Sequence, residues 1–68
     1  MTDGTRRRLV ILGRAEGEAR AALGSVMLLA QALEGLGLAS AERVVEDIRT
    51  SLVDVRECVN RAISEVKT

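Results

Sequence analysis

The sequence predicts an all-α protein, an antiparallel helical hairpin that we expect to dimerise into a four-helix bundle. Apolar residues recur at alternating spacings of three and four along two long segments, the periodicity of a helix that packs on another helix. The 68-residue chain has no proline, phenylalanine, tyrosine or tryptophan. Because strands favour aromatic residues and the turn signals occur at one place, the sequence indicates two helices in a single domain, residues 1–68.

The first helix is expected over residues 6–36, with Asp3 or Thr5 as its N-cap. Small side chains in the N-terminal half of its apolar seam should let the facing helix approach closely. The seam consists of Leu12, Ala15, Ala19, Ala22, Val26, Leu29, Leu33 and Leu36.

A turn is expected over residues 37–40, because Gly37 can adopt the left-handed backbone that closes a helix in a Schellman motif. Ser40 is the expected N-cap of the second helix, and Glu42 in the first turn favours the helix dipole. A connection this short makes the two helices antiparallel neighbours.

The second helix is expected over residues 41–67, with a charged outer face that includes Arg49 and Arg56. Two pairs on this face, Arg43 with Asp47 and Glu57 with Arg61, have the spacing of helical ion pairs. Val53 alone among the apolar residues is predicted to point outward, and Cys58 is predicted to be a small buried hydrophobic residue. The seam consists of Ala41, Val45, Ile48, Leu52, Val55, Val59, Ala62 and Val66.

The first helix also carries a stripe of small and apolar residues on the side opposite its seam. Glycine inside a helix costs about 1 kcal/mol relative to alanine, yet three glycines share this side. Small residues spaced by four allow close contact between helices. We expect the stripe to be a partner or dimer interface; the alternative is a solvent-facing side of poor helix propensity. Its residues are Val10, Gly13, Gly17, Ala21, Gly24 and Leu28.

Three consecutive arginines, Arg6, Arg7 and Arg8, open the first helix. Positive charge at a helix N-terminus opposes the helix dipole. The cluster is either a solubilising end or a contact for an acidic partner or a nucleic-acid backbone. Ten basic and ten acidic residues cancel, and no aromatic side chain is present to stack on bases. A nucleic-acid-binding regulator is therefore the alternative function and not the leading one.

The inventory of side chains argues against an enzyme. The chain has no histidine and one cysteine, so the common catalytic triads, zinc sites and internal disulfides cannot be assembled. We expect no cofactor and no metal. The longest uncharged run, residues 21–33, is shorter than the roughly 20 residues that cross a bilayer, so we do not expect a membrane protein.

A chain of this size rarely buries enough apolar surface alone to hold more than about 3–5 kcal/mol of stability, and oligomerisation is the means of stabilisation left to it. We therefore expect a non-enzymatic protein–protein interaction module, an adaptor, chaperone-like cap or inhibitor, that forms a homodimer and binds a further protein. The lone cysteine and the absence of a secretory pattern at residues 1–5 predict a cytoplasmic location.

Overall fold

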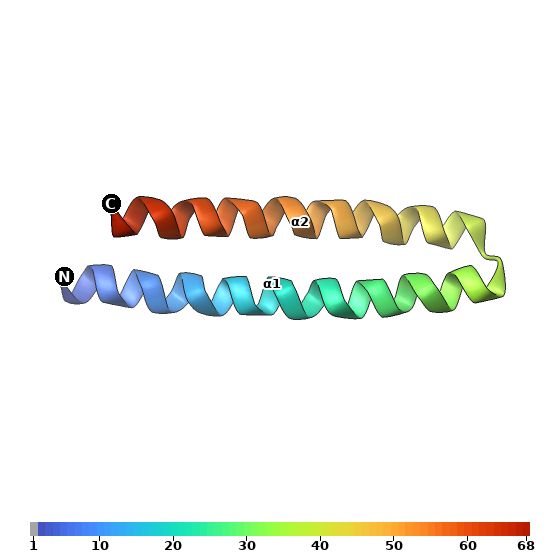
Figure 1. Ribbon diagram of the computed structural model, residues 1–68, viewed down its shortest axis with the longest axis horizontal. Coiled ribbons are helices and arrows are strands. Elements are labelled where there is room, and N and C mark those ends of the chain that lie inside the picture. Colours follow the sequence, from blue (N-terminus) through green and yellow to red (C-terminus); the bar gives the residue numbers. More distant parts are fainter. Residues whose placement is uncertain (1) are drawn as a thin grey trace.

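The computed structural model describes residues 2–68 and consists of two long helices, α1 (Asp3–Leu36) and α2 (Ala39–Lys67). The helices run antiparallel and pack side by side along their length, in a rod of 52 × 14 × 11 Å (Figure 1). The predicted all-helical hairpin is confirmed for the described residues.

The helix α1 begins three residues earlier than predicted. Its N-cap is Thr2, whose Oγ1 accepts a hydrogen bond from the backbone N–H of Thr5 at 3.1 Å. Thr2 competes well for this position because a hydroxyl at the N-cap satisfies an otherwise unpaired N–H of the first turn. Asp3 and Thr5, the predicted caps, both lie inside the first turn, where the carboxylate of Asp3 favours the helix dipole.

The turn closes α1 in the predicted Schellman motif. Gly37 has φ 68° and ψ 29°, in the left-handed region that glycine adopts without a steric penalty. Its N–H donates to the carbonyl of Glu34 at 3.1 Å, and the N–H of Leu38 donates to the carbonyl of Leu33 at 3.3 Å. These are the two hydrogen bonds that define the motif.

The connection is shorter than predicted, because α2 starts at Ala39. Its N-cap is Leu38, which has no side-chain oxygen to offer, and its first turn is held by the hydrogen bond from the Glu42 N–H to the Leu38 carbonyl at 2.9 Å. Ser40 is therefore not the N-cap but a residue of the first turn. The Schellman motif places Leu38 directly at the start of α2, which leaves no room for a separate capping residue.

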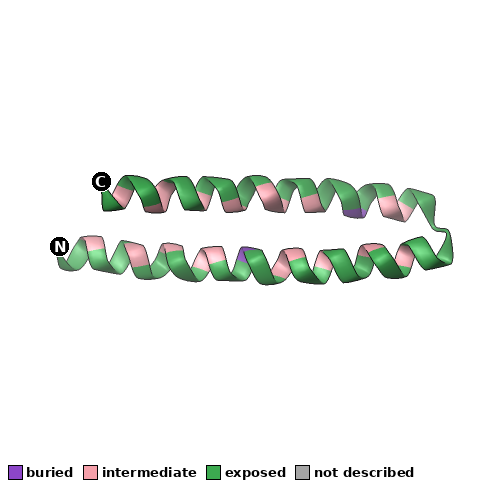
Figure 2. Cartoon of the chain, viewed as in Figure 1, coloured by how far each residue is buried: buried purple, intermediate pink, exposed green. Residues whose placement is uncertain are grey.

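The helices contact each other through positions that alternate at spacings of three and four, as in a coiled coil. Figure 2 shows that the buried and half-buried residues lie on the facing sides. In each helix one row of these positions, spaced by seven, belongs to the predicted seam, and we call it the central row. It consists of Leu12, Ala19, Val26 and Leu33 in α1 and of Val45, Leu52, Val59 and Val66 in α2.

The second half-buried row in each helix, which we call the charged row, follows the central row by four positions and was not part of the predicted seam. Two of its members, Arg49 and Arg56, were predicted on the outer face but are half-buried. Val53, which lies next to this row and was predicted to point outward, is half-buried as well. An arginine tolerates this position because its aliphatic stem covers apolar surface while its charged end stays paired or hydrated. The charged row consists of Leu9, Glu16, Leu23 and Ala30 in α1 and of Glu42, Arg49, Arg56 and Ile63 in α2.

The remaining predicted seam positions form a third row, which we call the aliphatic row. Its alanines are half-buried, but its large members Leu29, Leu36, Ile48 and Val55 are 49, 71, 44 and 50% exposed. The seam prediction is wrong for these four residues, because the helices meet nearer their charged rows and only the small alanines of the aliphatic row stay within the interface. The row consists of Ala15, Ala22, Leu29 and Leu36 in α1 and of Ala41, Ile48, Val55 and Ala62 in α2.

The interface between the helices is shallow. Among the described residues, only Ala19 and Val45 are buried, with 6% and 5% of their surface exposed. A two-helix rod has no interior, so every large side chain of its interface keeps one edge in water. The hairpin therefore leaves much of its apolar surface uncovered.

Candidate partner-binding surface

The predicted stripe forms an edge of α1 that does not contact α2. We call it the glycine edge, and its residues Val10, Gly13, Gly17, Ala21, Gly24 and Leu28 are all exposed. Val10 and Leu28, at its two ends, are 61% and 69% exposed. Because α1 is continuous from Asp3 to Leu36, the helical repeat brings these residues together along one side of the rod.

The glycines of this edge are not required by the packing of the hairpin. A methyl group added at Gly13, Gly17 or Gly24 would meet no atom within 4 Å outside the local backbone. Their backbone is helical, so no unusual torsion angle demands glycine either. The cost in helix propensity thus has no compensation within residues 2–68.

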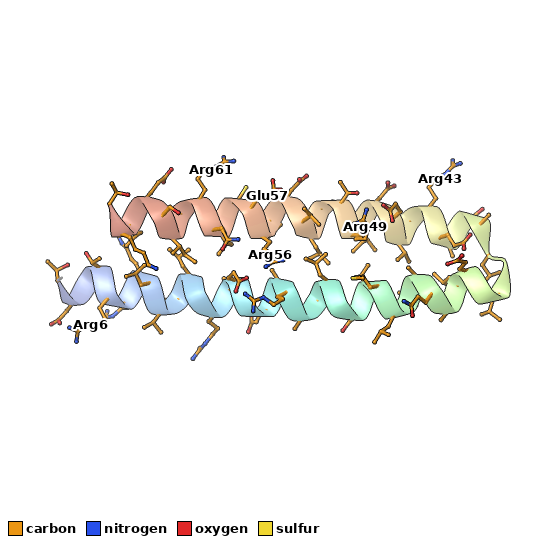
Figure 3. The ribbon with its side chains drawn as sticks, viewed as in Figure 1. Arg6, Arg43, Arg49, Arg56, Glu57 and Arg61 are labelled. Atoms are coloured by element: carbon orange, nitrogen blue, oxygen red, sulfur yellow. The ribbon has the colours of Figure 1, made fainter. Side chains whose placement is uncertain are left out.

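One charged residue near the edge faces the opposite way. The side chain of Glu16 is only 14% exposed and lies against α2, where its Oε1 accepts hydrogen bonds from Arg20 Nη2 at 2.7 Å and from Arg56 Nε at 3.2 Å. Figure 3 shows Arg56 between the two helices. Hydrogen bonding by Arg20, followed by the positive charge of Arg20 and the contact with Arg56, lowers the pKa of Glu16, although burial acts in the other direction.

A further ion pair lies within α2, nearer the turn than Arg56. Both carboxylate oxygens of Glu46 accept from Arg49 Nε at 3.1 Å, and this hydrogen bonding lowers the pKa of Glu46 and raises the pKa of Arg49. The predicted pairs of Arg43 with Asp47 and Glu57 with Arg61 do not form among the described residues. Arg43, Glu57 and Arg61 instead point away from α1 (Figure 3).

The arginine cluster is exposed and lies on the first two turns of α1, at the open end of the hairpin, where the start of α1 reaches past the end of α2 (Figure 1). Within residues 2–68, Arg6, Arg7 and Arg8 form no ion pair. Consecutive helical residues point in different directions, and Arg6 points away from α2 (Figure 3). The cluster therefore surrounds the tip of the hairpin and does not line one face.

Two features of the surface differ from what the sequence predicts. Cys58 is exposed and not buried, because the interface of α2 is centred on the charged side of its central row. Leu29, Leu36, Ile48 and Val55 of the aliphatic row are exposed as well, although they were predicted in the interface. The sequence could have indicated this exposure, since each helix has more apolar rows than a single neighbouring helix can cover.

Within the described part of the chain, neither helix has the length of apolar sequence that a membrane span needs. Comparisons with protein-family models, with curated proteins and with solved structures find no significant match to this chain.

Proposed function

We propose that this protein is a non-enzymatic interaction module that acts as an oligomer and binds another protein, as an adaptor, a chaperone-like cap or an inhibitor. The observation that carries the proposal is the glycine edge of α1. It presents three glycines and an alanine, with exposed Val10 and Leu28 at its ends, on the side of the helix that α2 leaves free.

A partner helix explains this composition better than solvent does. Small side chains let a second backbone approach closely, and the contact can offset the poor helix propensity of glycine. The hairpin itself gives the glycines no such compensation, since nothing in it lies within reach of an added methyl group. An uncharged edge of this kind suits an apolar or small-residue helix of the partner.

Photo-crosslinking in the native cell tests this proposal. The tagged wild-type chain is compared with a Gly17→Leu/Gly24→Leu variant, in which two bulky side chains block the edge. Leucine is a better helix former than glycine, so the hairpin should remain folded. We expect the crosslinked protein partner to be lost from the variant.

The matched control is a Glu57→Leu/Ser64→Leu variant, which places two leucines at the same spacing on the exposed side of α2. It should retain the partner. If the edge variant and the control capture the same protein equally well, partner binding by the glycine edge is wrong.

A second candidate is nucleic-acid binding by Arg6, Arg7 and Arg8. It is favoured by the exposure of all three side chains at the open end of the hairpin. Titration of a labelled duplex at low salt, followed by fluorescence anisotropy, checks it. Replacing the three arginines by glutamine should abolish binding and its salt dependence, whereas Arg43→Gln/Arg61→Gln should have a small effect.

A further inference from the structure

We infer that the aliphatic rows of α1 and α2 form one face of the hairpin and that this face packs on the same face of a second copy of the chain. The inference rests on the oligomer in the proposed function and assigns the interface of that oligomer. It also leaves the glycine edge free for a different partner.

The Glu16–Arg56 hydrogen bond shows that the rows of the two helices lie on common faces. Both residues belong to charged rows, and their contact places the charged rows of α1 and α2 on the same broad face of the rod. In each helix the aliphatic row lies on the other side of the central row. The two aliphatic rows therefore share the opposite broad face.

This face has the pattern of a second helix-packing seam. In α2, the exposed residues Val44, Ile48, Ser51 and Val55 follow each other at spacings of four and three. Each helix of a four-helix bundle contacts two neighbours and needs two adjacent seams. The hairpin supplies one neighbour for each helix, and its second seam remains uncovered.

The distribution of charge also favours an additional partner for this face. The hairpin half-buries Arg49 and Arg56 between its helices while Ile48 and Val55 remain 44% and 50% exposed. Arginine can occupy such a position at the border of an interface, because its charged end still reaches water. Isoleucine and valine gain nothing from exposure, so a second chain packed on the aliphatic rows would bury apolar side chains that the hairpin leaves in water.

The exposed area matches what a dimer buries. A folded monomer of 7.3 kDa is expected to expose about 4,200 Å². The hairpin exposes 5220 Å², about 1,000 Å² more. Stable interfaces bury about 800 Å² on each partner, so a second copy on this face would bring the exposed surface per chain close to that of an ordinary folded protein.

Sedimentation equilibrium over a range of protein concentrations tests the inference. We expect the wild-type chain to have twice its monomer mass, and Ile48→Glu to weaken the association by about 100-fold or more, because two unpaired carboxylates would be buried in a symmetric interface. The matched control is Met27→Glu. Met27 is similarly exposed, at 54%, but lies on the charged side of α1, so this variant should remain dimeric.

A cysteine-protection experiment uses milder changes, in case Ile48→Glu fails to fold. In a Cys58→Ser background, Ser51→Cys places a thiol on the aliphatic face and Ser64→Cys places one on the outer side of α2. Both serines are exposed in the hairpin. Alkylation of Ser51→Cys should slow as the protein concentration rises, while alkylation of Ser64→Cys should not change.

The outcomes separate this inference from the proposed function. If Ile48→Glu stays dimeric, Ser51→Cys is unprotected and Gly17→Leu/Gly24→Leu becomes monomeric, the aliphatic face is not the dimer interface, but the proposed oligomer stands. A wild-type chain that is monomeric at every concentration overturns both the inference and the oligomer. In that case, crosslinking through the glycine edge decides separately whether another protein binds.

Discussion

Glu16 and Arg56, 40 positions apart in the sequence, form the only side-chain hydrogen bond between the helices among the described residues. The carboxylate of Glu16 also accepts from Arg20 of its own helix, so one half-buried group binds an arginine from each helix. This contact fixes which broad face of the rod is charged and which is aliphatic.

Acidification should destabilise the hairpin through Glu16 and Glu46. Both groups have a folded-state pKa below their ordinary value of 4.5, because arginines hydrogen-bond their charged forms. The stabilisation is fully present above pH 4.5 and is lost as the pH falls through the lower folded-state pKa values. Urea unfolding followed at a series of pH values should show this loss, and Glu16→Gln should reduce it. The exposed Glu34→Gln serves as the control.

Alanine at Gly17 and Gly24 should stabilise the isolated hairpin. Each replacement gains about 1 kcal/mol of helix propensity, and the added methyl group meets no neighbouring atom. Urea unfolding of Gly17→Ala, Gly24→Ala and the double variant measures the gain. A loss of stability in all three would show that the glycines serve the hairpin itself.

Gly37→Ala should have the opposite effect. The left-handed backbone at φ 68° costs a residue with a β-carbon about 1–2 kcal/mol, although space for the methyl group is available. The free energy of unfolding should fall by that amount. Since Gly35 lies inside α1 with helical torsion angles, Gly35→Ala is the matched control and should be neutral or stabilising.

Val45→Ala should be among the more destabilising substitutions in α2. Val45 is 5% exposed, and removal of its two methyl groups loses about 1.6 kcal/mol of burial. Val10→Ala, at a position 61% exposed, should change the free energy of unfolding by less than about 0.5 kcal/mol. Thermal and urea unfolding of the two variants at equal concentration gives the comparison.

The sequence predicted the architecture well because its strongest signals are local. The spacing of apolar residues identified both helices, and Gly37 located the turn and its hydrogen bonds. Helix starts were less accurate, since several residues near each start can serve as the cap. Thr2 took that role in α1, and the Schellman motif made a capping side chain unnecessary in α2.

The rows beside the central rows could not be assigned from periodicity alone. Residues 15 and 16 differ by one position, as do residues 48 and 49, and each pair flanks the central row of its helix. The apolar side chains of Leu29, Leu36, Ile48 and Val55 placed them in the predicted interface together with the central rows. In the structure the charged rows occupy that place, joined by Glu16 and Arg56, and the apolar residues lie on the free face.

The regular spacing of these rows has a consequence for how the chain can change in length. Every seven residues of α1 face about seven residues of α2, and successive layers repeat the same geometry. Deleting or inserting one such block in both helices at the same level would shorten or lengthen the rod while keeping every remaining residue on its original side. A change in one helix alone would leave the two ends unmatched.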